Sequence, residues 1–227
     1  MSLVWHGVGT AQEWENTLHG GIEVNKIKEM MLAQNEISQG WSMVDIEGRR
    51  DIDKRLSLYQ LPLNKSDIVL DVGCNVGFMS LALSPSVQLV HGIDTDTDLL
   101  EIADYTKDLL NIENVFFYEK NIIKLESANK FDLILSLQIH MWVKKPFEEY
   151  IDKIFSLLKP GGRLLFESHD LETVDIDIDD KVKYIQLKGA KIENSKEYAE
   201  KNTFYVKKPR GAKETIRRKF FLFRKPL

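Results

Sequence analysis

Residues 68–77 read Ile-Val-Leu-Asp-Val-Gly-Cys-Asn-Val-Gly, and this stretch decides the fold. Three apolar residues that favour a β-strand run into Asp71, and the glycines at 73 and 77 precede residues 78–83, which have helical composition. The pattern predicts a strand, a tight turn and the start of a helix. Glycine at such a turn lets the backbone approach a ligand closely, and the first turn of a helix offers unpaired N–H groups to an anion. We therefore expect a ligand with an anionic end at this turn.

The spacing within the turn excludes two other nucleotide-binding folds. A dinucleotide-binding dehydrogenase has Gly-x-Gly-x-x-Gly directly after the strand, whereas Gly73, Asn75 and Gly77 are each two residues apart. A P-loop closes with Gly-Lys followed by Ser or Thr, whereas Gly77 is followed by Phe78 and Met79.

The sequence of residues 71–77 resembles the Asp/Glu-x-Gly-x-Gly-x-Gly motif of class I S-adenosylmethionine-dependent methyltransferases, and the resemblance continues to about Asp170. The middle glycine of the motif is Asn75 here, and asparagine is the non-glycine residue that best tolerates a positive φ angle. The resemblance implies an α/β fold: a Rossmann-like seven-stranded sheet with an antiparallel last strand, helices on both faces and an N-terminal helical cap. It also implies S-adenosylmethionine as cofactor and S-adenosylhomocysteine as product.

Length and composition set the domain organisation. The chain has 227 residues, of which 43% are hydrophobic, enough to bury the core of one α/β domain. We expect residues 1–60 to form a helical extension and residues 61–227 the methyltransferase domain. The single cysteine, Cys74, excludes an internal disulfide framework and a multi-cysteine zinc site. No apolar run approaches the roughly 18 residues of a membrane span, and the N-terminus lacks a signal-peptide pattern, so we expect a soluble cytoplasmic protein.

The N-terminal extension has the pattern of two helices. Apolar residues in 22–37 share one face, and a second helix over residues 49–60 precedes Pro62. In the family such an extension often covers the cofactor and helps to build the acceptor pocket, which makes Trp41 and Arg49 candidates for substrate binding. Packing and solvated roles explain these residues equally well.

Polar residues after successive predicted strands give the expected cofactor site. A strand over 87–93 ends in Asp94, whose carboxylate can accept hydrogen bonds from both ribose hydroxyls. Asn121 follows a strand over 115–119, where the family usually has an aspartate that binds the adenine amino group, and Ile122 would contact the ring. The resemblance implies a cofactor site made of Asp71, Gly73, Cys74, Asn75, Gly77, Asp94, Thr95, Asn121, Ile122 and Gln138.

The expected reaction site follows the next two strands. Residues 131–137 predict a central strand, after which His140 and Trp142 should border the transferred methyl group. A helix over 147–158, a Lys-Pro-Gly-Gly turn and a strand over 163–166 deliver Glu167 and His169 to the same face. His140 is the first candidate for a general base and His169 the second, with Glu167 or Asp170 orienting or replacing it; a structural role for each histidine stays open. The spacing of these residues demands no metal.

The C-terminal region carries an excess of positive charge. We expect a helix over 179–187 and strand pieces at 190–192, 204–206 and 219–224. From residue 207 onward the sequence contains nine Lys and Arg but only one acidic residue, Glu214. This segment therefore has a formal charge of +8, and residues 1–206 have a charge of −12. It is compatible with an edge strand protected by charge, a site for a phosphorylated or carboxylated acceptor, or an RNA contact.

These patterns predict methyl transfer to a hydroxyl of a small molecule or sugar, including phosphorylated sugars of surface-glycan biosynthesis. Residues 41–61 look like an extension found in methyltransferases of bacterial glycan modification, and somewhat like wobble-uridine tRNA methyltransferases. An RNA methyltransferase is therefore the alternative enzyme, and a non-catalytic binding module is the alternative from another class. The sequence does not indicate an oligomeric state.

Overall fold

The computed structural model describes residues 22–34, 38–126, 130–201 and 215–227. The expected strand piece at 204–206 and the basic residues before 215 lie outside these ranges. The main sheet is built from β3 (Ile68–Val72), β4 (Leu89–Asp94), β5 (Val115–Glu119), β6 (Phe131–Leu137), β7 (Leu158–Glu167), β8 (Lys191–Lys201) and β9 (Thr215–Arg224). The helices are α2 (Ile22–Ala33), α3 (Ile52–Tyr59), α4 (Phe78–Leu83), α5 (Thr97–Leu109), α6 (Phe147–Leu157) and α7 (Ile178–Leu187), and β1 (Gln39–Gly40) pairs with β2 (Arg50–Asp51).

The order of the seven strands confirms the predicted fold. The sheet runs β5-β4-β3-β6-β7-β9-β8; the first five strands are parallel, and β9 is antiparallel to both of its neighbours. Strand order reverses between β3 and β6. In open parallel sheets the crevice at such a reversal, beyond the carboxyl ends of the strands, binds the ligand.

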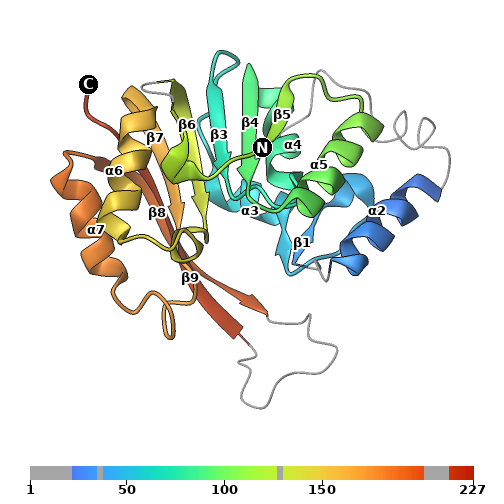
Figure 1. Ribbon diagram of the computed structural model, residues 1–227. Coiled ribbons are helices and arrows are strands. Elements are labelled where there is room, and N and C mark those ends of the chain that lie inside the picture. The colour runs from blue at the N-terminus through green and yellow to red at the C-terminus, as the bar shows by residue number, and fades with distance from the viewer. Residues whose placement is uncertain (1–21, 35–37, 127–129, 202–214) are drawn as a thin grey trace.

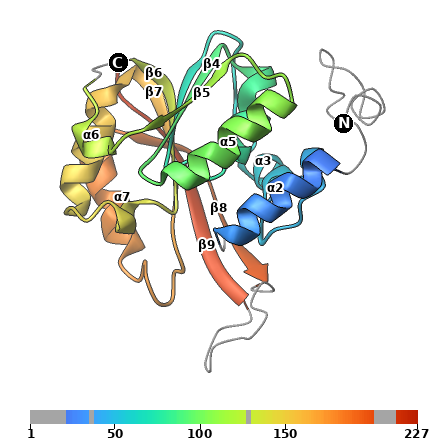
Figure 2. The same cartoon turned by 45° about the vertical axis from the view of Figure 1, so that its right-hand side comes forward.

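Alternating side chains of the strands form two hydrophobic cores. Val69, Leu133 and Leu165 point toward α2, α3, α4 and α5, whereas their neighbours Leu70 and Ile134 point toward α6 and α7. Figures 1 and 2 show these two groups of helices on opposite sides of the sheet. Buried residues of α2 and α3 belong to the same core as the sheet, so the described part of the N-terminal extension packs as an integral layer of the domain.

The turn after β3 has the backbone that its glycines predicted. Gly73, Asn75 and Gly77 have φ angles of 69°, 55° and 75°, and asparagine adopts the left-handed conformation in place of the family's middle glycine. Two of these residues are also sterically constrained, because a Cβ atom on Gly73 would lie 2.5 Å from Ile139 and one on Gly77 would lie 2.5 Å from Phe117.

Two C-terminal features differ from the predictions. The Lys-Pro-Gly-Gly segment is a bulge inside β7, since α6 passes directly into the strand and the register with β6 shifts between Phe131 and Leu133. The basic last strand β9 is an inner strand, and β8 forms the edge, so the idea of a charge-protected terminal edge is wrong for residues 215–225. Instead, glutamates of β8 pair with β9 arginines: Arg217 with Glu197, Arg218 with Glu200, and Arg224 with Glu193.

No helix among the described residues combines the length and the apolar character needed to cross a bilayer.

The two constraints on Gly77 lead to a testable prediction. Gly77→Ala should lower the free energy of unfolding by about 3 kcal/mol, because left-handed strain of about 1–2 kcal/mol adds to overpacking against Phe117 and Ala103. Gly161→Ala is the matched control, since Gly161 has a similar φ of 71° but its Cβ would meet only the end of the Leu227 side chain, at 3.1 Å. Urea unfolding measures both, and equal losses would contradict the packing argument.

Candidate functional site

A hollow lies at the carboxyl ends of β3, β4 and β5, beside the point where strand order reverses. Its lining comes from the turn after β3, the end of β4, the segment after β5 and the turn after β6. Five of the predicted cofactor residues are in this lining, which consists of Val72, Gly73, Ile93, Asp94, Thr95, Lys120, Asn121, Ile122, Ile139, Trp142 and Val143.

Asp94 ties the rim of this cofactor hollow to the glycine turn. One oxygen of its carboxylate accepts the backbone N–H of Asn75 at 2.9 Å, and the other accepts those of Thr95 at 2.7 Å and Asp96 at 3.2 Å. The first oxygen keeps lone-pair capacity for a ligand hydroxyl. The side-chain oxygen of Asn121 accepts the backbone N–H of Ile123 at 2.9 Å, so this residue also caps the short 3₁₀ turn that holds Ile122.

The remaining motif residues shape the turn from behind. Within residues 73–77 every amide donates inside the protein: Gly73 and Cys74 to the Ile93 carbonyl, Asn75 to Asp94, Val76 to the Asn75 side chain, and Gly77 to the Cys74 carbonyl. The amides of the turn itself are therefore used within the protein, and the predicted anion contact would fall to the first-turn amides of α4. Cys74 is buried, and burial raises the pKa of its thiol, which fits a packing role.

Asp71 is a buried carboxyl group at the end of β3. It accepts a hydrogen bond from the Ser80 hydroxyl at 2.7 Å. Burial raises its pKa from 3.8 to about 6, although the bond from Ser80 acts in the opposite direction. A cationic group of a ligand placed above the turn would favour the ionised form.

Two histidines converge on an aspartate that the sequence analysis did not single out. His140 follows β6, His169 follows β7, and their rings lie 4.8 Å apart. His140 Nε2 is 2.9 Å from one oxygen of Asp175, and the other oxygen accepts the backbone N–H of His169 at 2.5 Å. Asp170, which was expected near His169, instead accepts hydrogen bonds from Glu172 and Thr173 in the following loop.

The electrostatics of this histidine cluster keep Asp175 ionised. Burial alone would raise the pKa of Asp175, but the hydrogen bonds from His140 and Lys181 and the nearby His169 ring, whose Nδ1 is 3.6 Å away, hold it well below its usual range. Burial lowers the pKa of His169. Among the described residues, His140 Nδ1 and both ring nitrogens of His169 are buried without a hydrogen-bond partner. Buried polar atoms normally have partners, so these three nitrogens indicate a place for a ligand or a water.

The same cluster has the composition of a metal site. Donor atoms of His140, His169 and Asp175 lie within 4.8 Å of one another. The ammonium of Lys181, however, is 2.5 Å from the Asp175 oxygen that also faces His140, and it would compete with a cation there. The position of Lys181 therefore disfavours a cation at this cluster.

Glu167, an expected acid or base, has a different environment. It is fully buried and accepts hydrogen bonds from Arg55, Tyr59, Tyr198 and, at 2.6 Å, the Gln138 side chain. Burial alone would raise its pKa, but Arg55 and these donors lower it. With two donors on each oxygen, the carboxylate has no free position for a substrate proton. Glu167 thus orients Gln138, which is itself buried with a φ of 60°, and does not act as the base.

The three residues expected to bind the substrate lie in three different environments. Trp142 is 66% exposed on the rim of the cofactor hollow. Trp41 is only 4% exposed and packs against Phe78, with ring centroids 5.9 Å apart, so it is a core residue and not part of an acceptor pocket. Arg49 is half-buried before β2 and does not line the cofactor hollow.

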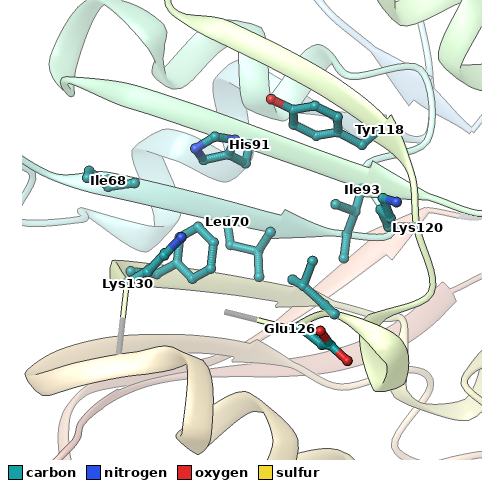
Figure 3. A pocket seen from close by; sticks show the side chains of 10 residues that line it. Ile68, Leu70, His91, Ile93, Tyr118, Lys120, Glu126 and Lys130 are labelled. Atoms are coloured by element: carbon teal, nitrogen blue, oxygen red, sulfur yellow. The ribbon is translucent and has the colours of Figure 1, made fainter. Parts of the chain in front are cut away.

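A second hollow lies on the sheet face that α6 and α7 leave uncovered (Figure 3). The ring of His91 stacks on Tyr118 at 5.8 Å beside an aliphatic floor that includes Leu70. Ile93 and Lys120 line both hollows. This face is bare because only a 3₁₀ turn, and no α-helix, connects β5 to β6 in the described part of that crossover.

Comparisons with known proteins agree with this geometry. A family model described as a methyltransferase domain matches residues 63–219. The ubiquinone biosynthesis O-methyltransferase of Coxiella burnetii is 30% identical over 104 residues, which are 46% of this chain and 44% of that protein. The malonyl-[acyl-carrier protein] O-methyltransferase of Halalkalibacterium halodurans is 30% identical over 111 residues, 46% of this chain and 40% of that protein. Each match thus spans less than half of the relative.

Among solved structures, the N-methyltransferase NodS of Bradyrhizobium japonicum WM9 in complex with S-adenosylhomocysteine has a TM-score of 0.62 at 16% identity. The superposition covers 91% of this chain and all of that one. At this identity the likeness shows the fold.

The raised pKa of Asp71 predicts a pH dependence of stability. The folded protein holds this proton more tightly than the unfolded chain does, so the contribution of Asp71 to stability falls as pH rises from 3.8 through about 6. The loss amounts to about 3 kcal/mol. Asp71→Asn keeps an acceptor for Ser80 and should remove this loss. In urea unfolding between pH 4.5 and 7.5, the free energy of unfolding of the variant should rise relative to that of the wild type as pH rises. Parallel pH dependences would contradict a raised pKa for Asp71.

The hydrogen bonds around Glu167 predict that removing a buried partner lowers the free energy of unfolding much more than removing an exposed charge. Arg55→Met should lower the free energy of unfolding by about 3–5 kcal/mol, because it leaves a buried carboxylate without its counter-charge. Lys54→Met is the control from the same helix, since Lys54 is exposed and pairs at the surface with Asp51. Adding Glu167→Gln to Arg55→Met should recover part of the loss in urea unfolding. A further loss in the double variant would contradict the explanation.

Proposed function

Since the chain belongs to the class I S-adenosylmethionine-dependent methyltransferases, we propose that it transfers a methyl group to a hydroxyl oxygen of a small molecule. The observation that carries this proposal is the buried pair of imidazoles that share Asp175. His140 is flanked in sequence by Ile139 and followed by Trp142, which both line that hollow. A hydroxyl acceptor loses its proton when it is methylated, and a neutral imidazole can take that proton.

The residues of the hollow fit S-adenosylmethionine chemically. The Asp94 carboxylate suits a vicinal diol, and Ile93, Ile122 and Val143 offer apolar surface to a planar base. The cofactor supplies a methyl group already activated on a sulfonium. The protein therefore has to align the acceptor and take up its proton.

Each side chain then has one task in this proposal. His140 accepts the proton of the acceptor hydroxyl, and His169 contributes a second neutral ring beside it. Trp142, exposed on the rim, covers the acceptor. Gln138, held by Glu167, fixes the backbone where β6 ends.

We propose a sugar hydroxyl, including that of a phosphorylated sugar, as the acceptor. Support for a sugar comes from the likeness of residues 41–61 to glycan-modifying methyltransferases, whereas the names of two relatives, both O-methyltransferases, support only transfer to oxygen. The described β9 arginines pair with β8 glutamates, which offsets the charge that an RNA contact would use. Transfer RNA is therefore included as the alternative acceptor in the methyl-transfer assay described below.

Cofactor binding tests the premise. In calorimetric titration with S-adenosylhomocysteine, Asp94→Asn should weaken binding at least tenfold, because the ribose hydroxyls lose a charged hydrogen-bond acceptor. Asp98→Asn, at an exposed position in the first turn of α5, should bind like the wild type. Absence of binding by the wild-type chain would instead favour a non-catalytic binding module.

Methyl transfer tests the reaction. Radiolabelled S-adenosylmethionine should label a sugar or sugar phosphate from a panel that also contains unmodified tRNA. His140→Asn should lower kcat by roughly 10²–10⁴ with unchanged S-adenosylhomocysteine affinity, as expected for loss of a general base. His91→Asn is the matched control in the second hollow. Labelling of tRNA alone, or full turnover by His140→Asn, would overturn the proposal.

A further inference from the structure

The geometry around Asp175 carries the proposed function one step further. Asp175 lies in the loop before α7 and is completely buried. One of its oxygens faces both His140 Nε2, at 2.9 Å, and the Lys181 ammonium, at 2.5 Å. The other accepts the backbone N–H of His169. One carboxylate thus connects the segments that follow β6 and β7 with the first turns of α7.

An ionised carboxylate can only accept hydrogen bonds, and this fixes the tautomer of His140. The ring nitrogen that faces Asp175 has to carry a hydrogen, so Nε2 is protonated and the lone pair of the neutral ring is on Nδ1. Nδ1 is buried and has no partner within the described chain. The available lone pair is therefore the one turned away from Asp175.

Several charged groups and aromatic rings surround His140 and His169. Lys181 contributes a positive charge that Asp175 and Asp177 share. His169 and Arg218 lie on the other side, and Arg218 pairs with Glu200. The rings of Phe147 and Phe166 also lie near His140, with centroid distances of 5.7 and 5.2 Å. Asp175 is the anion in direct contact with His140.

We infer that Asp175 is a positioning residue that holds His140 as its Nε2–H tautomer, so that Nδ1 receives the proton of the acceptor hydroxyl. This inference rests on the proposed methyl transfer. As the oxygen–methyl bond forms, the sulfur–methyl bond breaks and sulfur keeps the electron pair. The hydroxyl proton passes to Nδ1, and the resulting imidazolium lies beside the Asp175 carboxylate, which stays ionised throughout.

The tautomer is measured without any acceptor, so this test stands even if the proposed reaction fails. Long-range ¹H–¹⁵N spectra of the full chain, with His140 assigned by the loss of its signals in His140→Gln, should show Nε2 protonated and Nδ1 unprotonated. Asp175→Asn should change or mix the tautomers, and Asp180→Asn, an exposed carboxylate on α7, should not. A His140 ring protonated at Nδ1 in the wild type overturns the inference.

Turnover separates positioning from a purely structural role. Asp175→Asn should lower kcat roughly tenfold or more with unchanged S-adenosylhomocysteine affinity, because the general base is no longer held in its reactive tautomer. Asp175→Glu keeps a carboxylate and should recover part of that loss. Lys183→Met, whose partner is the exposed Asp180, is the control. Full turnover by Asp175→Asn, or an equal loss in Asp175→Glu, would overturn the inference.

Discussion

The architecture depends on the buried negative charge of Glu167, at the carboxyl end of β7. Glu167 is out of contact with water, and such a charge is tolerated only when donors surround it. Those donors come from distant parts of the sequence: Arg55 and Tyr59 from α3, Gln138 from the end of β6, and Tyr198 from β8. The N-terminal extension, the centre of the sheet and its far edge therefore assemble around one carboxylate. Because the same carboxylate holds Gln138, the demands of stability also determine the shape of the reaction site.

The cofactor hollow and the histidine cluster differ in how completely their polar groups are hydrogen-bonded within the protein. In the glycine turn, every amide from Gly73 to Gly77 is used internally, and Asp94 joins the turn to β4. The turn is thus a rigid rim for the hollow. In the histidine cluster, three ring nitrogens are buried and have no hydrogen-bond partner in the described part of the chain. One region is fully satisfied and fixed, and the other retains unmet hydrogen-bonding capacity where chemistry is expected.

Local patterns predicted most of the fold and five of the residues that line the hollow beyond β3 and β4. The helix over 78–83 and the strands over 115–119 and 131–137 appear with the expected bounds, because apolar periodicity and turn residues are local signals. Asp175 and Arg55 were missed because their partners lie far away in sequence, and a run of acidic residues gives no sign of which one turns inward. Trp41 was misassigned because an aromatic residue beside a glycine has the same local appearance in a pocket and in a core. The bulge in β7 was taken for a turn because both use Pro and Gly.

The position of β9 has a consequence for how the molecule is made. This strand follows all the others in the chain, yet it lies between β7 and β8. During vectorial synthesis β7 and β8 are available first, and the gap between them stays open until β9 has been translated. Tyr198, carried by β8, cannot be held in register beside Glu167 before then. A nascent chain halted before β9 would therefore lack the Tyr198 donor and leave the Glu167 carboxylate incompletely paired.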